Sequence, residues 1–221
     1  MRDMNDRIAI VAGATGLVGG LLVEELLARQ DWARVLTVGR RKIGREHPKL
    51  EERVVDLASL EEGGALPRAD AAFCCLGTTI KKAGSQQAFR AVDLDAVAHF
   101  ARAAKSGGTQ RFFVVTALGA DPRSRVFYNR VKGEAEQALR QVEFATLGIA
   151  RPSLLLGERA ESRPGERVAI VLSRALRPLL SLLPARPIEA RAVARALVAM
   201  AGSERTGAYV CSSAELQALG A

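Results

Sequence analysis

The chain has 221 residues, of which 48% are hydrophobic, and its 32 Lys and Arg outnumber 24 Asp and Glu to give a net charge of +8. That length fits one domain with a sizeable core. It contains no run of 18 apolar residues and no apolar leader at its start, which predicts a soluble, cytoplasmic protein without a membrane partner. The basic residues are scattered and aromatic residues make up only 5%, so we expect no nucleic-acid partner. The positive charge would instead attract a polyanionic cofactor.

Residues that bind metals or act as nucleophiles are few and far apart. Cys74 and Cys75 are neighbours in an apolar run and Cys211 is distant, a spacing that suits neither disulfides nor a metal site. We interpret all three as small buried hydrophobic residues. His47 and His99 are also widely separated, and a G-x-S-x-G motif is absent. The sequence therefore predicts neither a metal centre nor a serine hydrolase.

A glycine-rich run, GATGLVG at residues 13–19, lies between a strand pattern and a helix pattern. Residues 8–12 are continuously apolar, as in a buried parallel strand, and residues 17–29 have helical apolar spacing. Glycine permits a tight turn and close approach of a ligand, and a helix start presents unpaired N–H groups to an anion. The run, from Gly13 onward, therefore predicts a phosphate site. A plain turn that closes a strand–helix corner is the alternative.

Strand and helix patterns alternate along most of the remaining chain. Further strands are expected over residues 34–38, 53–55, 71–75, 111–115 and 144–150, and helices over residues 87–105 and 124–141. This alternation predicts an α/β fold, a Rossmann-type doubly wound parallel sheet with helices on both faces. We expect one domain, in which residues 153–221 add a small substrate-side or lid portion. That portion is predicted to hold helices over residues 167–183 and 191–200 and a last strand over residues 208–211.

Two arginines, Arg40 and Arg41, follow the second predicted strand directly. In dinucleotide-binding folds an acidic residue here binds the adenosine ribose, whereas arginine accommodates a 2′-phosphate. A guanidinium presents a planar set of donors that suits phosphate. The pair therefore predicts NADPH as the cofactor in preference to NADH. Two solvent-exposed loop arginines are the alternative interpretation.

The third and fourth predicted strands end in further candidate cofactor residues. Asp56 and Leu57 follow the third strand, and Leu76, Gly77 and Thr78 follow the fourth. Ligands in open α/β sheets bind at the carboxyl ends of strands. There Asp56 would accept a hydrogen bond from the adenine amine, and Gly77 would permit close approach of a ribose. Asp and Gly also end strands simply because they favour turns.

Tyr128 and Lys132 are the strongest catalytic candidates. Four residues apart on a predicted helix, they share one face and point into the same cleft. A neighbouring ammonium favours the phenolate form of a tyrosine, which suits the tyrosine to proton transfer. The sequence has only two tyrosines, so a chance pair at this spacing is disfavoured.

Several motifs together resemble the short-chain dehydrogenase/reductase superfamily. They are GATGLVG, VGRR, CLGTTIKKAG, TALGADPRS, YNRVKGEAE and RPSLLLG. More closely, the set is similar to the atypical branch that contains the Tat-interactive-protein-like oxidoreductases. The resemblance covers about residues 7–164 and fades over the last third of the chain.

The resemblance implies a role for each motif. Lys132 would hold the hydroxyls of the nicotinamide ribose and activate Tyr128, which would protonate the substrate oxygen. Pro152 would lie against the nicotinamide. Four residues of the glycine run would wrap the pyrophosphate: Thr15, Gly16, Leu17 and Val18.

The sequence departs from this family after the fifth strand, where a Ser or Thr normally binds the substrate carbonyl. Relatives often show two serines where this chain has Thr116 and Ala117. If the working hydroxyl occupies the first position, Thr116 supplies it. If it occupies the second, Ala117 removes it, and catalysis is in question.

These observations favour an NADPH-dependent oxidoreductase that acts on a small carbonyl substrate through Tyr128 and Lys132. The alternative is an NADPH-sensing regulatory or scaffold protein without turnover, and a nucleotide-sugar epimerase is a third hypothesis. A homodimer or a regulatory protein partner remains open.

Overall fold

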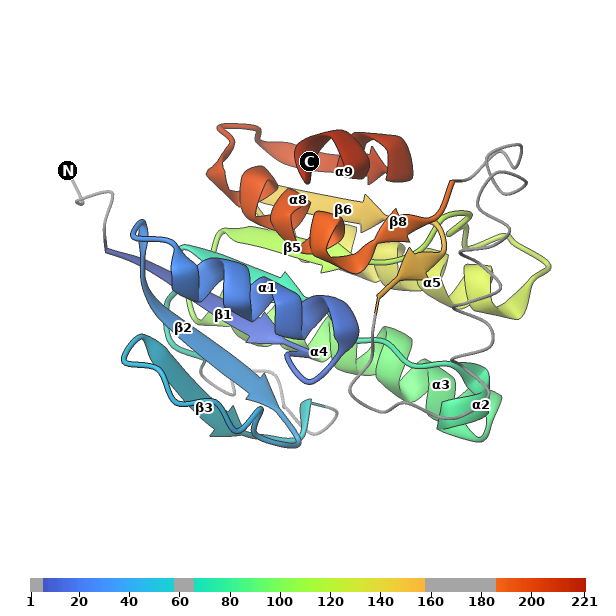
Figure 1. Ribbon diagram of the computed structural model, residues 1–221. Helices are drawn as coiled ribbons and strands as arrows, with labels where there is room; N and C mark the ends of the chain where they lie inside the picture. Colours follow the sequence, from blue (N-terminus) through green and yellow to red (C-terminus); the bar gives the residue numbers. More distant parts are fainter. Residues whose placement is uncertain (1–5, 58–65, 158–185) are drawn as a thin grey trace.

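The computed structural model describes residues 6–57, 66–157 and 186–221, which form a layered α/β fold (Figure 1). Its centre is a seven-stranded parallel sheet with the order β3-β2-β1-β4-β5-β6-β9. The strands are β1 (Arg7–Ala12), β2 (Trp32–Gly39), β3 (Leu50–Val54), β4 (Ala71–Cys74), β5 (Arg111–Val115), β6 (Thr146–Arg151) and β9 (Gly207–Ser212). The predicted Rossmann-type sheet is confirmed.

The direction of strand addition reverses beside β1. From β1 the chain proceeds through β2 to β3 at one edge, then returns to pair β4 with the other side of β1. All carboxyl ends therefore meet along one edge of the sheet, and the crevice for a ligand is expected where the order reverses, between β1 and β4.

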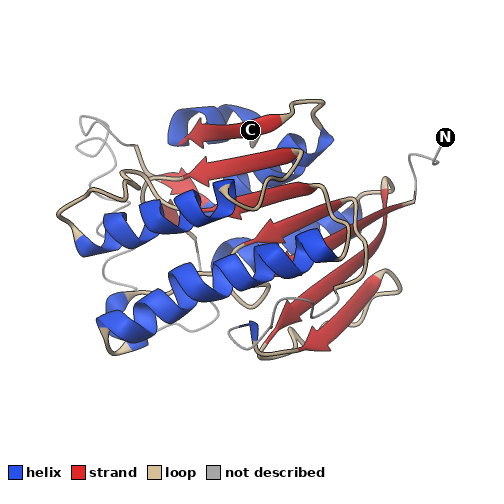
Figure 2. Cartoon of the chain, turned by 180° about the vertical axis from the view of Figure 1, so that it is seen from behind, coloured by secondary structure: helices blue, strands red, loops and turns tan. Residues whose placement is uncertain are grey.

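Helices cover both faces of the sheet. One face carries α1 (Leu17–Ala28) and α8 (Ala190–Gly202), with α9 (Ser213–Leu219) beside α8 (Figure 1). The other face carries α5 (Phe127–Arg140) and a long helical stretch made of α3 (Gln86–Arg90), η2 (Ala91–Asp95) and α4 (Ala96–Ser106) (Figure 2). A short helix, α2 (Ile80–Ala83), precedes α3. Over the described ranges, none of the helices is long and apolar enough to cross a membrane.

Both faces of the sheet bury apolar side chains, which explains why its central strands are continuously apolar in sequence. Adjacent residues of β5 show this alternation: Phe113 packs in the core under α1 and α8, while Phe112 packs in the core under α4. Phe113 stacks on Phe73 at 5.4 Å between ring centroids, and Phe112 stacks on Phe144 at 4.8 Å. The central strands are thereby fixed from both sides.

Several elements differ from the sequence predictions, and the short α2 was not predicted. The third strand begins at Leu50, not at residue 53, because β3 is an edge strand whose mostly exposed side chains give no apolar run. The helix predicted over residues 87–105 contains a π-helical segment, η2. Helix α9 was not predicted, although Ser212 and Glu215 form a capping box that is readable in the sequence.

Much of the segment predicted as the substrate-side portion belongs to the main layers. Strand β9 completes the large sheet and α8 covers its face. Within the described part of residues 153–221, only β7 (Leu155–Leu156) and β8 (Ile188–Glu189), neither of which was predicted, pair as a separate small sheet. The helix predicted over residues 167–183 lies outside the described residues.

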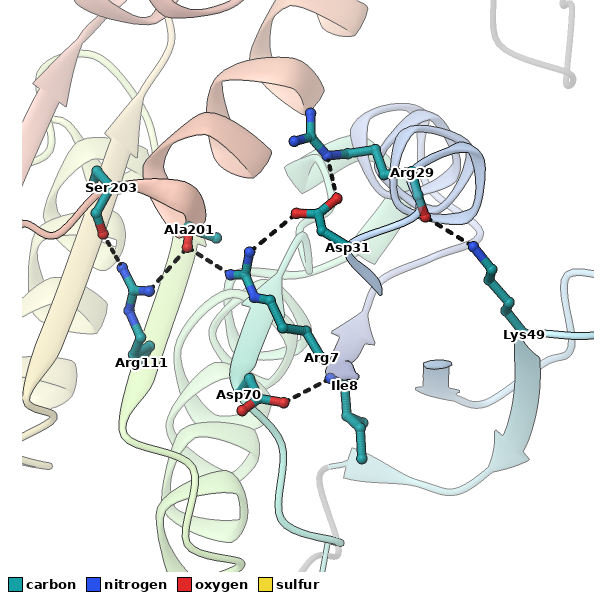
Figure 3. Close-up of polar contacts among 9 residues, drawn as sticks. All are labelled: Arg7, Ile8, Arg29, Asp31, Lys49, Asp70, Arg111, Ala201 and Ser203. Carbon is teal, nitrogen blue, oxygen red and sulfur yellow. Dashed lines mark hydrogen bonds and ion pairs between the residues drawn. The ribbon is translucent and has the colours of Figure 1, made fainter. Parts of the chain in front are cut away.

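Two arginines from the amino-terminal ends of strands hold the carboxyl-terminal end of α8 (Figure 3). Arg7 and Arg111 both donate to the carbonyl oxygen of Ala201, at 2.7 and 3.0 Å, and Arg111 also donates to that of Ser203 at 2.6 Å. Asp31 pairs with Arg7 at 3.2 Å. Cations at a helix carboxyl terminus satisfy its unpaired carbonyls and complement its dipole. These contacts fix α8, and through it α1, on the sheet.

We expect Arg111→Met to lower the free energy of unfolding by about 1–3 kcal/mol, because the carbonyl oxygen of Ser203 loses its charged donor and that of Ala201 loses one of its two, keeping Arg7. Methionine keeps an unbranched apolar side chain at this position but removes the guanidinium, whose carbon lies 5.7 Å from the centroid of the Phe113 ring. Arg195→Met is the control, since it removes an exposed ion pair to Glu25 at 3.4 Å and should cost less than about 1 kcal/mol. Urea denaturation measures both. Equal losses would show that Arg111 does not anchor α8.

Candidate functional site

The glycine turn packs directly against the end of β4. Gly13 has φ +82°, and a Cβ there would lie 2.5 Å from the carbonyl of Cys75 and 2.7 Å from the backbone nitrogen of Leu76. Both the backbone conformation and the space therefore require glycine. The turn is held at the point where the strand order reverses.

The other two glycines of the motif fix the start of α1. The N–H of Gly16 donates to the carbonyl oxygen of Gly13 at 2.9 Å, and a Cβ on Gly19 would overlap that same oxygen. Gly16 is the N-cap and has no side chain with which to cap the helix. Thr15 and Gly16 are exposed, so the amide donors at the helix start are accessible to an anion.

The side chains of Leu17 and Val18, the next two residues of the motif, pack against other parts of the protein. Val18 is buried in the core, and Leu17 is half-buried, with its side chain close to Gly157 at the end of β7. A role in wrapping a pyrophosphate would thus come from the backbone N–H of Val18 and not from its side chain.

Arg40 and Arg41 lie exposed in the loop after β2. Other residues anchor this loop: the N–H of Ile43 donates to Glu52 at 2.5 Å, Arg45 pairs with Glu24 at 2.9 Å, and Lys49 donates to the carbonyl of Arg29 at 2.9 Å. Within the described ranges neither Arg40 nor Arg41 forms an ion pair.

The residues after β3 and β4 have different environments. Asp56 is exposed beyond β3, whereas Leu57 is only 4% exposed and packs in the core under α4. Leu76 is half-buried against that core, while Gly77 is exposed. The side chain of Leu57 therefore supports the site from below and does not line it.

Lys132 is buried in an ion pair beside this turn. Its Nζ lies 2.7 Å from Oδ1 of Asp93, and the two side chains are 6% and 0% exposed. The other carboxylate oxygen of Asp93 accepts the N–H of Thr78 at 2.9 Å. A Cβ on Gly77 would lie 3.5 Å from Oδ1 of Asp93 and 3.6 Å from Nζ of Lys132. The ammonium therefore borders the glycine that follows β4.

Asp93 is a site residue that the sequence analysis missed. It lies in η2 between the apolar residues Val92 and Leu94. An acidic residue on the buried face of a helical pattern was the available signal, because a buried carboxylate requires a partner.

Tyr128 lies one helical turn before Lys132 on α5 and packs against the same neighbouring helical stretch. Its ring centroid is 5.6 Å from that of Phe89, four residues before Asp93. Two residues of that stretch, Phe89 and Asp93, thus contact the two predicted catalytic residues, Tyr128 and Lys132.

Thr116 is only 5% exposed and faces α5. Its hydroxyl lies 2.7 Å from Oε1 of Glu136 and 3.3 Å from the carbonyl of Ala150. Glu136 is held in turn by Arg151, with N–O distances of 2.9 and 2.5 Å. Because a hydroxyl has one proton to donate, this network engages the group that was predicted to bind a carbonyl. Ala117 beside it is buried and offers no hydroxyl.

A backbone hydrogen bond joins the loops after β5 and β6 at the carboxyl edge of the sheet. The N–H of Leu118 donates to the carbonyl oxygen of Pro152 at 2.9 Å, and Pro152 is buried. The predicted nicotinamide contact therefore lies directly beside the chain that follows Thr116 and Ala117.

Cys74, at the end of β4, is fully buried near the Asp93–Lys132 pair. Burial raises the pKa of its thiol to about 12, so the thiol remains neutral at physiological pH. Cys74 thus contributes packing and not nucleophilic chemistry, as predicted.

A protein-family model described as NAD(P)H-binding matches residues 13–204, a range that begins at the glycine turn. The chain belongs to this NAD(P)H-binding family. The family that the motifs predicted is confirmed, and the glycine turn fits a dinucleotide because close backbone packing at Gly13 and Gly19 holds the start of α1 against the end of β4. Members of a family can still differ in what they do with the dinucleotide.

Among the relatives, HTATIP2 from Rattus norvegicus is 39% identical over 170 residues, covering 75% of this chain and 70% of that protein. Mitochondrial FMP52 from Eremothecium gossypii is 31% identical over 215 residues, 96% of both chains. The solved structure of MoeE5 in complex with UDP-glucose and NAD has a TM-score of 0.70 at 22% identity, covering 92% of this chain and 75% of that one, and shows the shared fold. Since FMP52 is named mitochondrial, a cytoplasmic location for this chain stays a prediction.

We expect Gly19→Ala to weaken NAD(P)H binding roughly tenfold or more, because the added Cβ forces the carbonyl of Gly13 out of the turn. Gly20→Ala is the matched control. Its Cβ would lie 3.4 Å from the carbonyl of Ala14, an ordinary contact, and alanine in a helix interior should raise stability by up to about 1 kcal/mol. Fluorescence titration and urea denaturation measure the two effects. Equal dinucleotide affinities in the two variants would contradict the proposed packing role of Gly19.

Proposed function

We propose that this protein is an NADPH-dependent oxidoreductase that reduces a small carbonyl compound. The observation that carries the proposal is the position of Lys132. Its buried ammonium borders Gly77, whose strand end meets the glycine turn, and it lies one helical turn from Tyr128. A cation held at the carboxyl ends of the strands, next to a phenol, suits the nicotinamide end of a dinucleotide and a proton transfer.

When bound, a reduced nicotinamide dinucleotide supplies a hydride for the carbonyl carbon. The chain would supply the remaining chemistry. The ammonium of Lys132, which is held in an ion pair with Asp93, would donate to the hydroxyls of the nicotinamide ribose. The phenol of Tyr128 would donate its proton to the carbonyl oxygen, so that a ketone or aldehyde becomes an alcohol.

The preference for NADPH rests on the charges of the loop after β2. Arg45 is neutralised by Glu24, whereas Arg40 and Arg41 have no ion-pair partner among the described residues. The first acidic residue of the loop is Glu46, too late in the chain to replace the acid that binds a ribose diol directly after the strand. This arrangement supports recognition of a 2′-phosphate by Arg40 and Arg41.

We therefore expect Arg40→Ala to weaken NADPH binding by roughly tenfold and to change NADH affinity by less than about twofold. Arg45→Ala, which removes an arginine already paired with a carboxylate, is the control and should leave the ratio of the two affinities unchanged. Isothermal titration with both dinucleotides measures the ratio. An unchanged ratio in Arg40→Ala would refute this assignment.

A second candidate function, an NADPH-sensing protein without turnover, is favoured by a specific observation. Thr116 is engaged with Glu136, and Ala117 offers no hydroxyl, so the usual donor to a substrate carbonyl is missing from both positions. A partner protein would then detect whether the dinucleotide is bound to this chain.

Turnover separates the two functions. NADPH oxidation is followed with a panel of ketones, aldehydes and quinones. The epimerase hypothesis is tested separately by analysing UDP-glucose for conversion to an epimer, since epimerisation causes no net oxidation of the dinucleotide. We expect Tyr128→Phe to reduce kcat by roughly 100-fold or more with NADPH affinity retained, and Ala117→Ser to increase kcat. The control is Tyr209→Phe, which changes the other tyrosine, on β9. Tight NADPH binding with no turnover in any variant would establish the sensor.

A further inference from the structure

We infer that the substrate is a carbonyl compound with an apolar body, which lies against Leu118, Val126 and Leu154 beside Tyr128. The inference rests on the proposed function in that the carbonyl group must reach the phenol of Tyr128, and it names the class of substrate.

The three side chains belong to exposed residues of two adjoining loops. Leu118 is 48% exposed, Val126 58% and Leu154 62%. The first two belong to the loop between β5 and α5, and Leu154 follows β6. The N–H of Leu118 donates to the carbonyl oxygen of Pro152 at 2.9 Å, which joins the two loops at the carboxyl edge of the sheet. Single exposed hydrophobic residues are common on proteins, whereas several on adjoining segments indicate a surface that a ligand or partner covers.

A tight turn fixes the position of Leu118. Residues 117–120 form this turn, in which the last N–H donates to the first carbonyl oxygen at 3.1 Å. Gly119 has φ +78°, as the third residue of a type II turn requires. A Cβ on Gly119 would lie 3.0 Å from Nδ2 of Asn129, the residue after Tyr128. The turn therefore holds Leu118 next to the start of α5.

The rest of the loop lies directly on α5. The N–H of Asp121 donates to the carbonyl oxygen of Asn129 at 3.1 Å. A Cβ on Gly133 would lie 2.2 Å from the carbonyl carbon of Asp121, so the loop crosses the helix at a position that has no side chain. Arg130 donates to the carbonyl oxygen of Ser124 at 3.0 Å. The apolar side chains of this loop are thus presented by a backbone that is held in place at several points.

The stability of α5 does not explain the choice of valine at position 126. Val126 is the N-cap of α5, where Ser, Thr, Asp or Asn would stabilise the helix start. Its side chain forms no cap hydrogen bond, and more than half of the residue is exposed. Val126 lies two residues before Tyr128, so an apolar contact with a ligand at the phenol would account for it.

The position of the reacting carbonyl decides which part of a substrate would meet these side chains. Leu118 is bonded to Pro152, the predicted nicotinamide contact, and Leu154 follows two residues later, with its carbonyl held by the N–H of Ile188 at 2.9 Å. A carbonyl group placed between Tyr128 and a nicotinamide would direct its attached groups toward these loops. Hydroxyl or phosphate groups would gain no hydrogen bonds from three apolar side chains, whereas alkyl or aryl groups would lose contact with water.

Binding is tested first with straight-chain primary amides, from butanamide to octanamide, on the intact chain saturated with NADPH. An amide keeps the carbonyl oxygen but is not reduced by a nicotinamide hydride, so binding is measured without turnover. We expect the dissociation constant from isothermal titration to fall roughly two- to fourfold for each added methylene group.

Matched variants test the side chains. Leu118→Asn should weaken octanamide binding roughly tenfold and butanamide binding less than about twofold. Leu219→Asn is the control and should leave both unchanged, because Leu219 is 45% exposed at the end of α9. Val126→Thr, which keeps the side-chain shape, should weaken octanamide binding roughly threefold without lowering the melting temperature, since threonine can cap α5.

Turnover of straight-chain aldehydes from propanal to octanal provides the second measurement. We expect kcat/KM to rise with chain length, and less steeply in Leu118→Asn. The inference is overturned if amide affinity does not depend on chain length, or if Leu118→Asn binds the amides as Leu219→Asn does. Aldehyde reduction that is independent of chain length would also overturn it while retaining the proposed activity. Chain-length-dependent amide binding with no reduction of any carbonyl compound would support the apolar site and refute only the oxidoreductase activity.

Discussion

At Gly13 two stretches of backbone approach so closely that no side chain fits between them, and the rest of the site depends on this contact. The turn after β1 lies against the end of β4 because position 13 has no Cβ, and α1 starts against the turn because position 19 has none. The helix start is thus fixed at the point where the strand order reverses. A dinucleotide site in this family requires that the amide donors of α1 and the strand ends meet at one place, and backbone packing brings them together.

Buried charges fix the opposite side of the site, and they are concentrated on α5. Lys132 and Glu136, one helical turn apart, have opposite charges, and each is neutralised by a different element: Lys132 by Asp93 of η2, and Glu136 by Arg151 of β6. Buried ion pairs contribute less to stability than their distances suggest, because both charges lose water. The main effect of these two pairs is instead to fix the orientation of α5. They orient α5 so that Lys132 borders Gly77 after β4 while Glu136 engages Thr116 after β5.

The surface charges follow a different pattern. Arg191 and Arg195 of α8 pair with Glu24 and Glu25 of α1, and they join the two helices that cover one face of the sheet. Arg7 and Arg111 neutralise the carbonyl end of α8 at the opposite edge from the site (Figure 3). These four arginines are therefore engaged in holding the fold together. The arginines after β2 differ in that the described residues offer them no carboxylate, and this is why the proposed 2′-phosphate contact is assigned to them.

The sequence by itself determined the features that depend on residues close together along the chain. Alternating strand and helix patterns indicated the parallel sheet, the glycine run located the turn, and a spacing of four placed Tyr128 and Lys132 on one helix face. It did not reveal that Asp93 meets Lys132, that the hydroxyl of Thr116 faces Glu136, or that Leu57 points into the core. Only the tertiary structure decided these, because helical and strand periodicity fixes which residues share a face but not which element packs opposite. That choice follows from burying both faces of the sheet at once, and the π-helical segment, which sets the direction of Asp93, lies at the contact with α5.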